Sequence, residues 1–353
     1  MSHMKAIQAA MADAGLEALL LTDPVSCRYA TGFYFTDGAV LVRREDAFLI
    51  TDSRYTEAAE KESRDCTVLE YGRKRSPYAL AAELCAGLER VGAEEERMSV
   101  AEWRGWEERL ERKFAEASQI LKTLRRSKDP FELESIIAAQ RIAERALDDV
   151  LGLLRPGLTE KEVAAELTYR MLLYGGEEMS FDPIVVTGSK TSLPHGVPGD
   201  KVICAGDFVT MDFGTKKNGY CSDMTRTVAI GSVTEEMRRV YETVLEAQLA
   251  GIAAAKAGVR GCDIDGAARK VIADAGYGDF FGHGFGHSLG LEIHEAPNAN
   301  TRIERPMPAG AVISAEPGIY LPGRFGVRIE DMLVLGENGN ENLTKAPKEL
   351  IIL

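Results

Sequence analysis

The first third of the chain alternates between helix-like and strand-like patterns of apolar residues. Apolar positions recur at helical spacing over residues 4–15. Three short apolar runs follow, LEALLLT at 16–22, GAVLVRR at 38–44 and AFLITD at 47–52. Short apolar runs of this kind are typical of buried strands. The alternation predicts an α/β layered domain.

A basic, polar stretch follows this first region. KTLRRSKDP, at residues 122–130, resembles a linker in composition. A chain of 353 residues also exceeds the size at which one hydrophobic core usually stops growing, so two domains are expected. We therefore predict a smaller amino-terminal α/β domain at residues 1–124 and a larger domain at 125–353.

Two helix-start signals open the larger domain. Asp129, Pro130 and Glu132 occupy the N-cap, first and third positions of a predicted helix. Thr159 with Glu162 repeats the capping-box arrangement, so a second helix should follow directly.

Short β-rich runs dominate the chain from about residue 180, with one further helical pair over residues 234–276. This change of character predicts that the larger domain is α+β. The runs are PIVVTG, DFVTMDFG, DMTRTVAI, AVISAEPGIY and GVRIEDMLVL.

Composition and charge exclude several classes of function. The net charge of −13, from 42 basic and 55 acidic residues, repels phosphate backbones, so no nucleic acid partner is expected. No stretch approaches the ~18 consecutive apolar residues of a membrane span, and the first residues lack the apolar region of a signal peptide. The six cysteines are scattered without C-x-x-C or zinc-ribbon spacing, so we expect reduced thiols and a cytoplasmic location.

Two aspartates flank the strongest hairpin signal in the chain, Asn218-Gly219. If these two residues form the turn, Asp212 lies opposite Thr225, and Asp223 is its diagonal neighbour on the same face. Side chains of such diagonal pairs start ~7 Å apart, so two carboxylates can converge on one target.

The residues on either side of Asp212 also favour a role in binding a cation or a proton. A lone aspartate in a strand most often ends the strand or faces solvent. Asp212, however, sits between Met211 and Phe213 in an otherwise apolar strand, where an unpaired carboxylate would be costly to bury. It therefore needs a cation or a proton.

A second acidic pair, Glu316 and Glu330, flanks a turn that contains Pro-Gly. Strand alternation puts Arg328 and Glu330 on one face and Asp331 on the other, so we choose Glu330 as the inward acid. If all four acids converge, they form six like-charge pairs, each costing roughly 4 kcal/mol at 4 Å with an effective dielectric near 20. The sum, on the order of 20 kcal/mol, exceeds the ~5–15 kcal/mol that keeps a domain folded.

Protonation would relieve part of this repulsion, and two divalent cations would cancel all four charges. One neutral imidazole added to these oxygens makes a site suited to Mn²⁺, Co²⁺, Fe²⁺ or Zn²⁺.

Histidine is concentrated beside these acids. The chain has five histidines, and GHGFGHSLGLEIHEAP alone holds His283, His287 and His294, while His195 lies in SLPHGVPGD. A single histidine on an apolar strand is most often a hydrogen-bonded core residue. Four that fall beside acidic strands and glycine-rich turns favour a different interpretation, in which one binds metal and the others handle protons or substrate.

These segments resemble the M24-type metallopeptidase family of prolidases and Xaa-Pro aminopeptidases. The resemblance is carried by PHGVPGDKVICAGDFVTMDFG, GYCSDMTRT, GHSLGLEIHE, SAEPGIY and GVRIED, and it covers residues 125–353 closely. DPVSCRYATGF and LITDSRYTEAA resemble the family's smaller, creatinase-type amino-terminal domain. The resemblance implies an α+β pita-bread catalytic domain preceded by a smaller α/β domain.

Position by position, the resemblance implies a dinuclear metal site. Asp212 would bind the first metal, and Asp223 and Glu330 would bridge both metals. His287 and Glu316 would bind the second. The ions are expected to be Mn²⁺, with Co²⁺, Zn²⁺ or Fe²⁺ as alternatives.

The resemblance also implies the remaining site residues and the reaction. His195, His283 and His294 match histidines that contact substrate and stabilise the tetrahedral intermediate, and Arg328 matches an arginine behind the ligands. A hydroxide that bridges the metals would attack the carbonyl before proline, with Glu316 passing its proton to the departing nitrogen. The expected substrates are peptides with proline at the second position, and the expected assembly is a homodimer with contacts from the amino-terminal domain.

One position departs from the family pattern. The segment before Glu316 reads ISAE, where many relatives carry a more apolar or threonine-containing version, so we expect Ser314 to alter local packing.

Three alternatives remain open from the sequence. A methionine aminopeptidase-like enzyme would use the same five ligands but generally lacks the extra amino-terminal domain. A non-catalytic pita-bread peptide-binding protein would usually have lost ligands, and none is missing here. Whether the enzyme acts on Xaa-Pro dipeptides or on longer peptides is not decided by the sequence.

Overall fold

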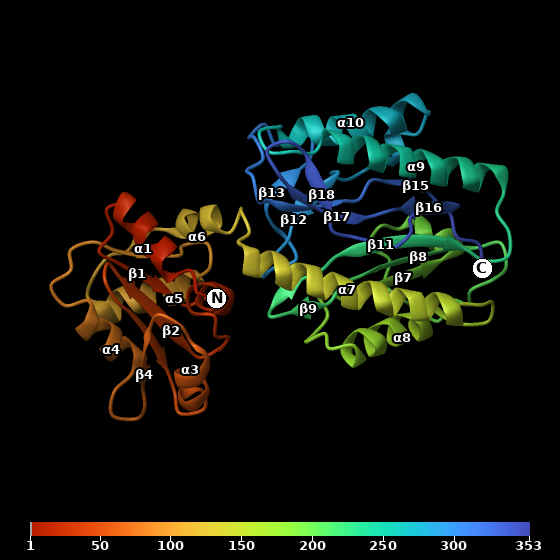
Figure 1. The fold of residues 1–353 in the computed structure, drawn as a ribbon. Coiled ribbons are helices and arrows are strands. Elements are labelled where there is room, and N and C mark those ends of the chain that lie inside the picture. The colour runs from red at the N-terminus through yellow and green to blue at the C-terminus, as the bar shows by residue number, and fades with distance from the viewer. Residues whose placement is uncertain (1) are drawn as a thin grey trace. The chain divides into compact units, whose positions relative to one another are not determined.

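The computed structural model describes residues 2–353 and divides after Arg125 into two compact units (Figure 1). We refer to them as the amino-terminal unit, up to Arg125, and the carboxy-terminal unit, from Arg126 onward. No helix within residues 2–353 is both long enough and apolar enough to cross a membrane.

The amino-terminal unit is built on one six-stranded mixed sheet with the strand order β4-β3-β2-β1-β5-β6. Buried apolar residues from both the sheet and the helices form its core. Its strands are β1 (Ala18–Leu21), β2 (Gly38–Arg43), β3 (Ala47–Thr51), β4 (Thr67–Glu70), β5 (Val91–Ala93) and β6 (Ala115–Glu116). Its helices are α1 (Met4–Asp13), α2 (Pro24–Thr31), α3 (Thr56–Glu62), α4 (Pro77–Leu84), α5 (Val100–Leu110) and α6 (Ser118–Leu124).

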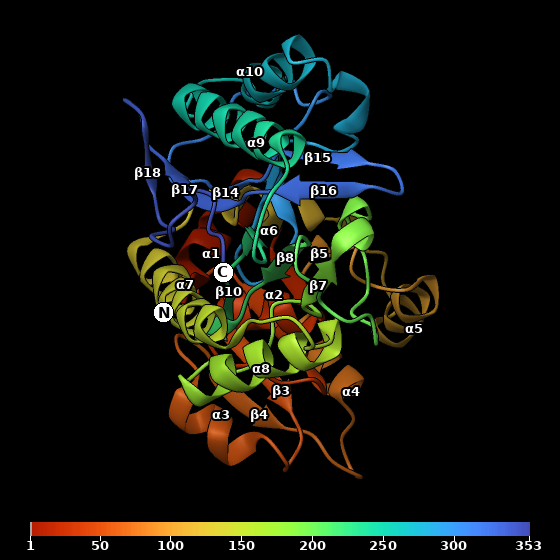
Figure 2. The same ribbon diagram turned by 90° about the vertical axis from the view of Figure 1, so that its right-hand side faces the viewer.

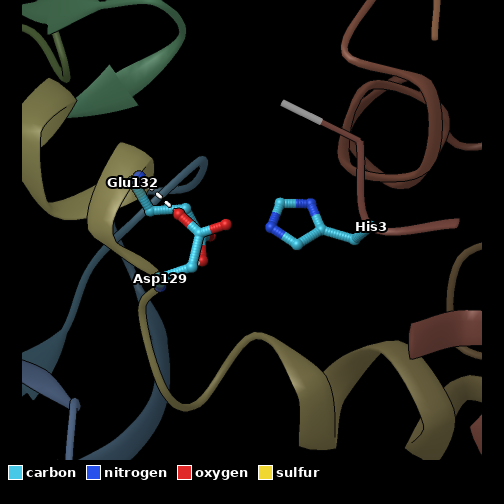
Figure 3. A group of neighbouring side chains, drawn as sticks. All are labelled: His3, Asp129 and Glu132. Atoms are coloured by element: carbon cyan, nitrogen blue, oxygen red, sulfur yellow. Dashed lines mark hydrogen bonds between the residues drawn. The ribbon is translucent and has the colours of Figure 1, made fainter. Parts of the chain in front are cut away.

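The helices of the carboxy-terminal unit begin at the predicted caps. Asp129 and Glu132 form a capping box in which each backbone N–H donates to the other's carboxylate, at 2.8 and 2.9 Å (Figure 3). Thr159 and Glu162 repeat it at the next helix. The helices are α7 (Pro130–Leu153), α8 (Glu160–Leu173), α9 (Glu235–Ala254) and α10 (Gly261–Asp274), with the short 3-10 helices η1 (Gly188–Ser192) and η2 (Gly278–Phe280).

The strands of this unit lie between the α7/α8 pair on one side and the α9/α10 pair on the other (Figures 1 and 2). They form antiparallel sheets of order β11-β8-β7 and β13-β12-β14-β17-β18, with the two-stranded ladders β10-β9 and β15-β16. The strands are β7 (Ile184–Thr187), β8 (Phe208–Phe213), β9 (Lys216–Lys217), β10 (Tyr220–Cys221), β11 (Met224–Ala229), β12 (Gly286–Ser288), β13 (Glu295–Ala299), β14 (Val312–Ala315), β15 (Gly318–Leu321), β16 (Phe325–Arg328), β17 (Asp331–Leu335) and β18 (Asn340–Asn342).

Two apolar cores hold these layers together. One joins α7 and α8 to the β7-β8-β11 sheet and includes Leu167 and Met211. The other joins α9 and α10 to the remaining strands and includes Tyr241, Ile264 and Ile313. The α+β arrangement expected for this part of the chain is therefore confirmed.

The hairpin register is also as predicted. Asn218 and Gly219 both adopt positive φ, 49° and 79°, as a type I′ turn requires. The strands on either side pair so that Thr225 lies opposite Asp212. Asp223, which precedes β11 by one residue, is thereby placed near Asp212.

Candidate metal centre and active site

The five predicted metal ligands line one cavity of about 590 Å³ in the carboxy-terminal unit. They come from separate strands and strand ends, so the two antiparallel sheets must pack together before the group exists. Asp212 belongs to β8, Asp223 precedes β11, His287 belongs to β12, Glu316 follows β14, and Glu330 lies between β16 and β17.

His287 is the residue about which the acids gather. Its Nε2 lies 3.6 Å from Asp223 Oδ2 and 3.3 Å from Glu316 Oε1. Ligand atoms of Asp223, His287 and Glu330 all lie within 4.8 Å of one another. Because His287 Nδ1 lies 3.2 Å from the carbonyl oxygen of Ser288, we assign the proton to Nδ1. The Nε2 lone pair then faces the carboxylates.

Burial and mutual repulsion disfavour the charged forms of these acids. Burial, and next the charges of Asp212 and Glu316, raise the pKa of Asp223 well above its ordinary value. Burial, followed by the charge of Asp223, does the same to the pKa of Glu330. The pKa of Glu316 is raised chiefly by burial. Burial also lowers the pKa of His287, so its imidazole is neutral at pH 7.

This donor set fits a divalent cation. Asp212 Oδ1 is buried and accepts no hydrogen bond from any group in residues 2–353, which is costly for a carboxylate oxygen unless a cation satisfies it. The lone pair of His287 Nε2 faces the carboxylate oxygens of Asp223 and Glu316, which are also acceptors, so a cation between them would satisfy all three groups. Two ligands of one ion, with bonds of about 2.0–2.2 Å, lie roughly 3 Å apart, close to the 3.3 Å between His287 and Glu316.

Arg328 changes the charge balance expected from the sequence. Its Nη2 lies 2.6 Å from Asp212 Oδ2, and its side chain is 4% exposed. The guanidinium is one cation of the kind that the apolar surroundings of Asp212 were predicted to require, and it lowers the charge that metals or protons must balance. One oxygen of Asp212 is committed to Arg328, while the other remains for a metal. Arg328 also donates to Thr225 Oγ1 at 3.1 Å, and Thr225 in turn donates to Glu330 at 2.7 Å.

Tyr320, in β15, is a site residue that the sequence analysis missed. Its hydroxyl accepts from Arg328 Nη1 at 2.9 Å and lies 2.9 Å from His283 Nε2. Burial raises the pKa of Tyr320 to about 12, so the phenol keeps its proton at neutral pH and donates it to His283. No spacing in the sequence pointed to this tyrosine, since β15 and η2 are brought together only by the fold.

The segment that carries His283 is held from α10. Arg269 donates to the carbonyl oxygens of Phe281 and His283 at 2.9 and 2.7 Å. Asp265, which is fully buried, pairs with Arg269 and accepts the backbone N–H of Phe285 at 2.9 Å. These contacts fix the backbone on both sides of the histidine, and they too were missed from the sequence.

The other candidate histidines line the same cavity. The ring of His294 packs against that of His287, with centroids 4.4 Å apart and planes at 69°. Burial, and next the neighbouring His287, lower the pKa of His294. His195 follows η1 and is exposed. Asp331, by contrast, points away from the cavity and pairs with Arg226 at 2.8 Å.

Fold and donor set together are those of a metal-dependent enzyme. The comparisons with known proteins are more specific. Residues 134–337 match metallopeptidase family M24, and residues 3–127 match the creatinase/prolidase N-terminal domain. The chain therefore belongs to metallopeptidase family M24. The predicted family and the fold class, a pita-bread domain preceded by a creatinase-type domain, are confirmed.

Individual relatives match over nearly their whole length. The Xaa-Pro dipeptidase of Pyrococcus furiosus is 36% identical over 343 residues, 97% of each chain. A solved structure titled Xaa-Pro dipeptidase from Bacillus anthracis has a TM-score of 0.95 at 39% identity and covers 99% of both chains. The X-Pro aminopeptidase from Thermotoga maritima has a TM-score of 0.93 at 38% identity, covering 98% of this chain and 100% of its own.

Proposed function

We propose that this protein hydrolyses the peptide bond between an amino-terminal residue and proline, with two divalent cations, Mn²⁺ first among them. The observation that carries the proposal is the convergence of one neutral imidazole and four carboxylates in a single cavity. The names of the relatives support the choice of peptide.

The proposed ligands divide between two ions. Asp212 would hold the first ion, His287 and Glu316 would hold the second, and Asp223 and Glu330 would be shared by both. When bound, such ions lower the pKa of a coordinated water toward ~7 and polarise a carbonyl oxygen.

The chain's own residues then handle protons and orientation. Glu316 accepts the proton of the attacking water and passes it to the departing proline nitrogen. His195 and His294 donate hydrogen bonds to the substrate carbonyl as negative charge develops on its oxygen. His283 is held in place by Tyr320, and Arg328 binds one oxygen of Asp212, so the other oxygen would be available to a metal.

The cavity also suits a proline ring. An Xaa-Pro bond has no amide N–H, so a peptidase recognises it through apolar contact rather than through that hydrogen bond. The cavity wall includes Phe181, Ile184, Pro194 and Ile293, which supply apolar surface beside the acids.

The test is hydrolysis by metal-free protein to which Mn²⁺, Co²⁺, Zn²⁺ or Fe²⁺ is returned. Xaa-Pro dipeptides and longer Xaa-Pro peptides should be cleaved, whereas matched Xaa-Ala peptides and peptides with amino-terminal Met-Ala should not. Glu316→Gln should abolish turnover, and Glu341→Gln, on the partly exposed β18, serves as the control. A chain that retains no divalent ion under any condition and cleaves none of these peptides would be the non-catalytic binding protein.

Three further predictions accompany this function. The homodimer, the cytoplasmic location and a domain at residues 1–124 that contributes oligomer and site-edge contacts follow from the family resemblance and the composition. Light scattering on the purified protein tests the dimer, and a strict monomer would count against it.

A further inference from the structure

Ser314, which was expected to alter local packing, is buried in β14 with its hydroxyl between two candidate ligands. Its Oγ accepts the backbone N–H of His287 at 2.9 Å. The same oxygen lies 2.9 Å from Glu316 Oε1, to which it donates its proton. One hydroxyl therefore contacts both residues that we assign to the second metal.

The directions of these two hydrogen bonds are fixed by chemistry. A backbone N–H can only donate, so it occupies a lone pair of the serine oxygen. An ionised carboxylate can only accept, so the single hydroxyl proton must go to Glu316. Threonine can make the same pair of bonds, but alanine and valine can make neither.

The backbone around Ser314 is shaped to allow this contact. A Cβ at Gly286 would lie 2.0 Å from the carbonyl oxygen of Ser314 and 2.8 Å from its Oγ, so only glycine lets β12 approach β14 this closely. The backbone N–H of Glu316 donates to Phe285 at 2.8 Å, and Gln248 donates to the carbonyl of Ala315 at 3.2 Å. The main chain is thus held by other groups, and Ser314 is left to orient the carboxylate.

From these contacts we infer that Ser314 is a positioning residue: its hydroxyl turns the Glu316 carboxylate toward His287 and so sets the affinity of this half of the site for metal. The inference rests on the proposed function in assigning His287 and Glu316 as ligands. It differs from the expectation of altered packing, because a packing role would depend on the volume of the side chain and not on its hydroxyl.

Threonine and valine separate the two roles, since their side chains have nearly the same volume and differ in one hydroxyl. Ser314→Thr, Ser314→Val and Ser314→Ala are made in the full chain. Mn²⁺ affinity is measured by titrating the metal-free protein in competition with a fluorescent chelator, with no peptide present. The values of kcat and KM on an Xaa-Pro peptide are measured separately.

We expect Ser314→Val and Ser314→Ala to lose roughly 10–100-fold in affinity for the second Mn²⁺ and in kcat, the usual effect of removing a group that orients a metal ligand. KM should change less than threefold, because no substrate contact is removed. Ser314→Thr should stay within about threefold of the wild type.

Valine and threonine variants with equal affinities would overturn the inference, as would an alanine variant that binds both ions as the wild type does. If Ser314→Ala does not fold, the Mn²⁺ affinities of Ser314→Thr and Ser314→Val still test the inference. The chelator titration needs no peptidase activity. A wild type that cleaves no Xaa-Pro peptide, yet loses Mn²⁺ affinity on Ser314→Val, would therefore refute the proposed function and leave the role of Ser314 standing.

Discussion

The acids of the metal site should destabilise the protein whenever metal is removed, and Asp223→Asn should relieve part of that cost. Asp223 is buried beside Glu330, and burial together with repulsion from neighbouring carboxylates raises the pKa of each carboxyl well above its ordinary value. Asparagine keeps the shape of the side chain and removes its charge. The variant should therefore be more stable than the wild type without metal, although it has lost a proposed ligand.

The magnitude follows from the separation of the two acids. Their nearest ligand atoms lie within 4.8 Å, and two unit charges at that distance repel by about 3.5 kcal/mol at an effective dielectric of 20. Partial protonation of the wild type reduces the gain below this value, so we expect Asp223→Asn to stabilise the metal-free protein by about 1–3 kcal/mol near pH 8. For a domain of this size, 3 kcal/mol corresponds to a rise in Tm of roughly 6–12 °C.

The sign of the pH dependence follows from the direction of the shifts. The pKa values of Asp223 and Glu330 are raised above their ordinary values of 3.8 and 4.5, so the folded state binds more protons than the unfolded state once the pH exceeds those values. Metal-free wild type should therefore lose stability as the pH rises from about 4 toward the raised pKa values. Asp223→Asn should show a shallower dependence.

The assay is scanning calorimetry in the presence of a chelator, at pH 8 and pH 6. Tryptophan fluorescence would mislead, because Trp103 and Trp106 are the two tryptophans of the chain and both belong to the amino-terminal unit. Asp200→Asn, with a side chain 87% exposed, is the control and should change stability by less than about 0.5 kcal/mol. An Asp223→Asn protein that is no more stable than wild type without metal would refute the repulsion argument.

Three other substitutions test neighbouring contacts. Arg328→Met should cost about 2–4 kcal/mol in chemical unfolding, because it leaves the Asp212 carboxylate, which is only 13% exposed, without its ion pair; a loss below 1 kcal/mol would show that the pair is not needed. Tyr320→Phe should lower kcat about tenfold with little change in KM, because His283 loses the hydroxyl that holds it; an unchanged kcat would contradict this. Arg269→Met should reduce kcat by roughly 10-fold, whereas unaltered turnover would show that the segment holds its own position.

Local structure was largely predictable because its causes are local. Capping boxes and helical spacing placed α7 and α8, since a cap satisfies backbone groups only a few residues away. The Asn218-Gly219 turn fixed the β8 to β11 register, and that register alone brought Asp212 and Asp223 to one face. The roles of the five proposed ligands came from the family resemblance and remain predictions that metal analysis can test.

The contacts behind these acids were not predictable, because strand alternation gives the face of a side chain but not its partner. Arg328 and Asp212 are 116 residues apart and meet only when β16 packs beside β8. Tyr320 follows β14 in the chain and its partner His283 precedes β12, so these two residues also meet only after folding. Ser314 was noticed as an unusual residue, yet its two hydrogen bonds depend on how closely β12 approaches β14.

The backbone around the site is held firmly in place, while the carboxylates inside the site carry more negative charge than the nearby cationic side chains neutralise. Apolar cores on both faces and the hydrogen bonds of Arg328 hold the backbone, so the acids cannot move apart to relieve their repulsion. Only protons or cations can relieve it, and near neutral pH a divalent ion supplies two charges at once. Repulsion between the acids lowers the free energy of unfolding of the metal-free protein. Metal binding raises it again, because an ion that binds only the folded state stabilises that state by mass action. Metal affinity and the instability of the metal-free protein are in this way two measures of the same repulsion.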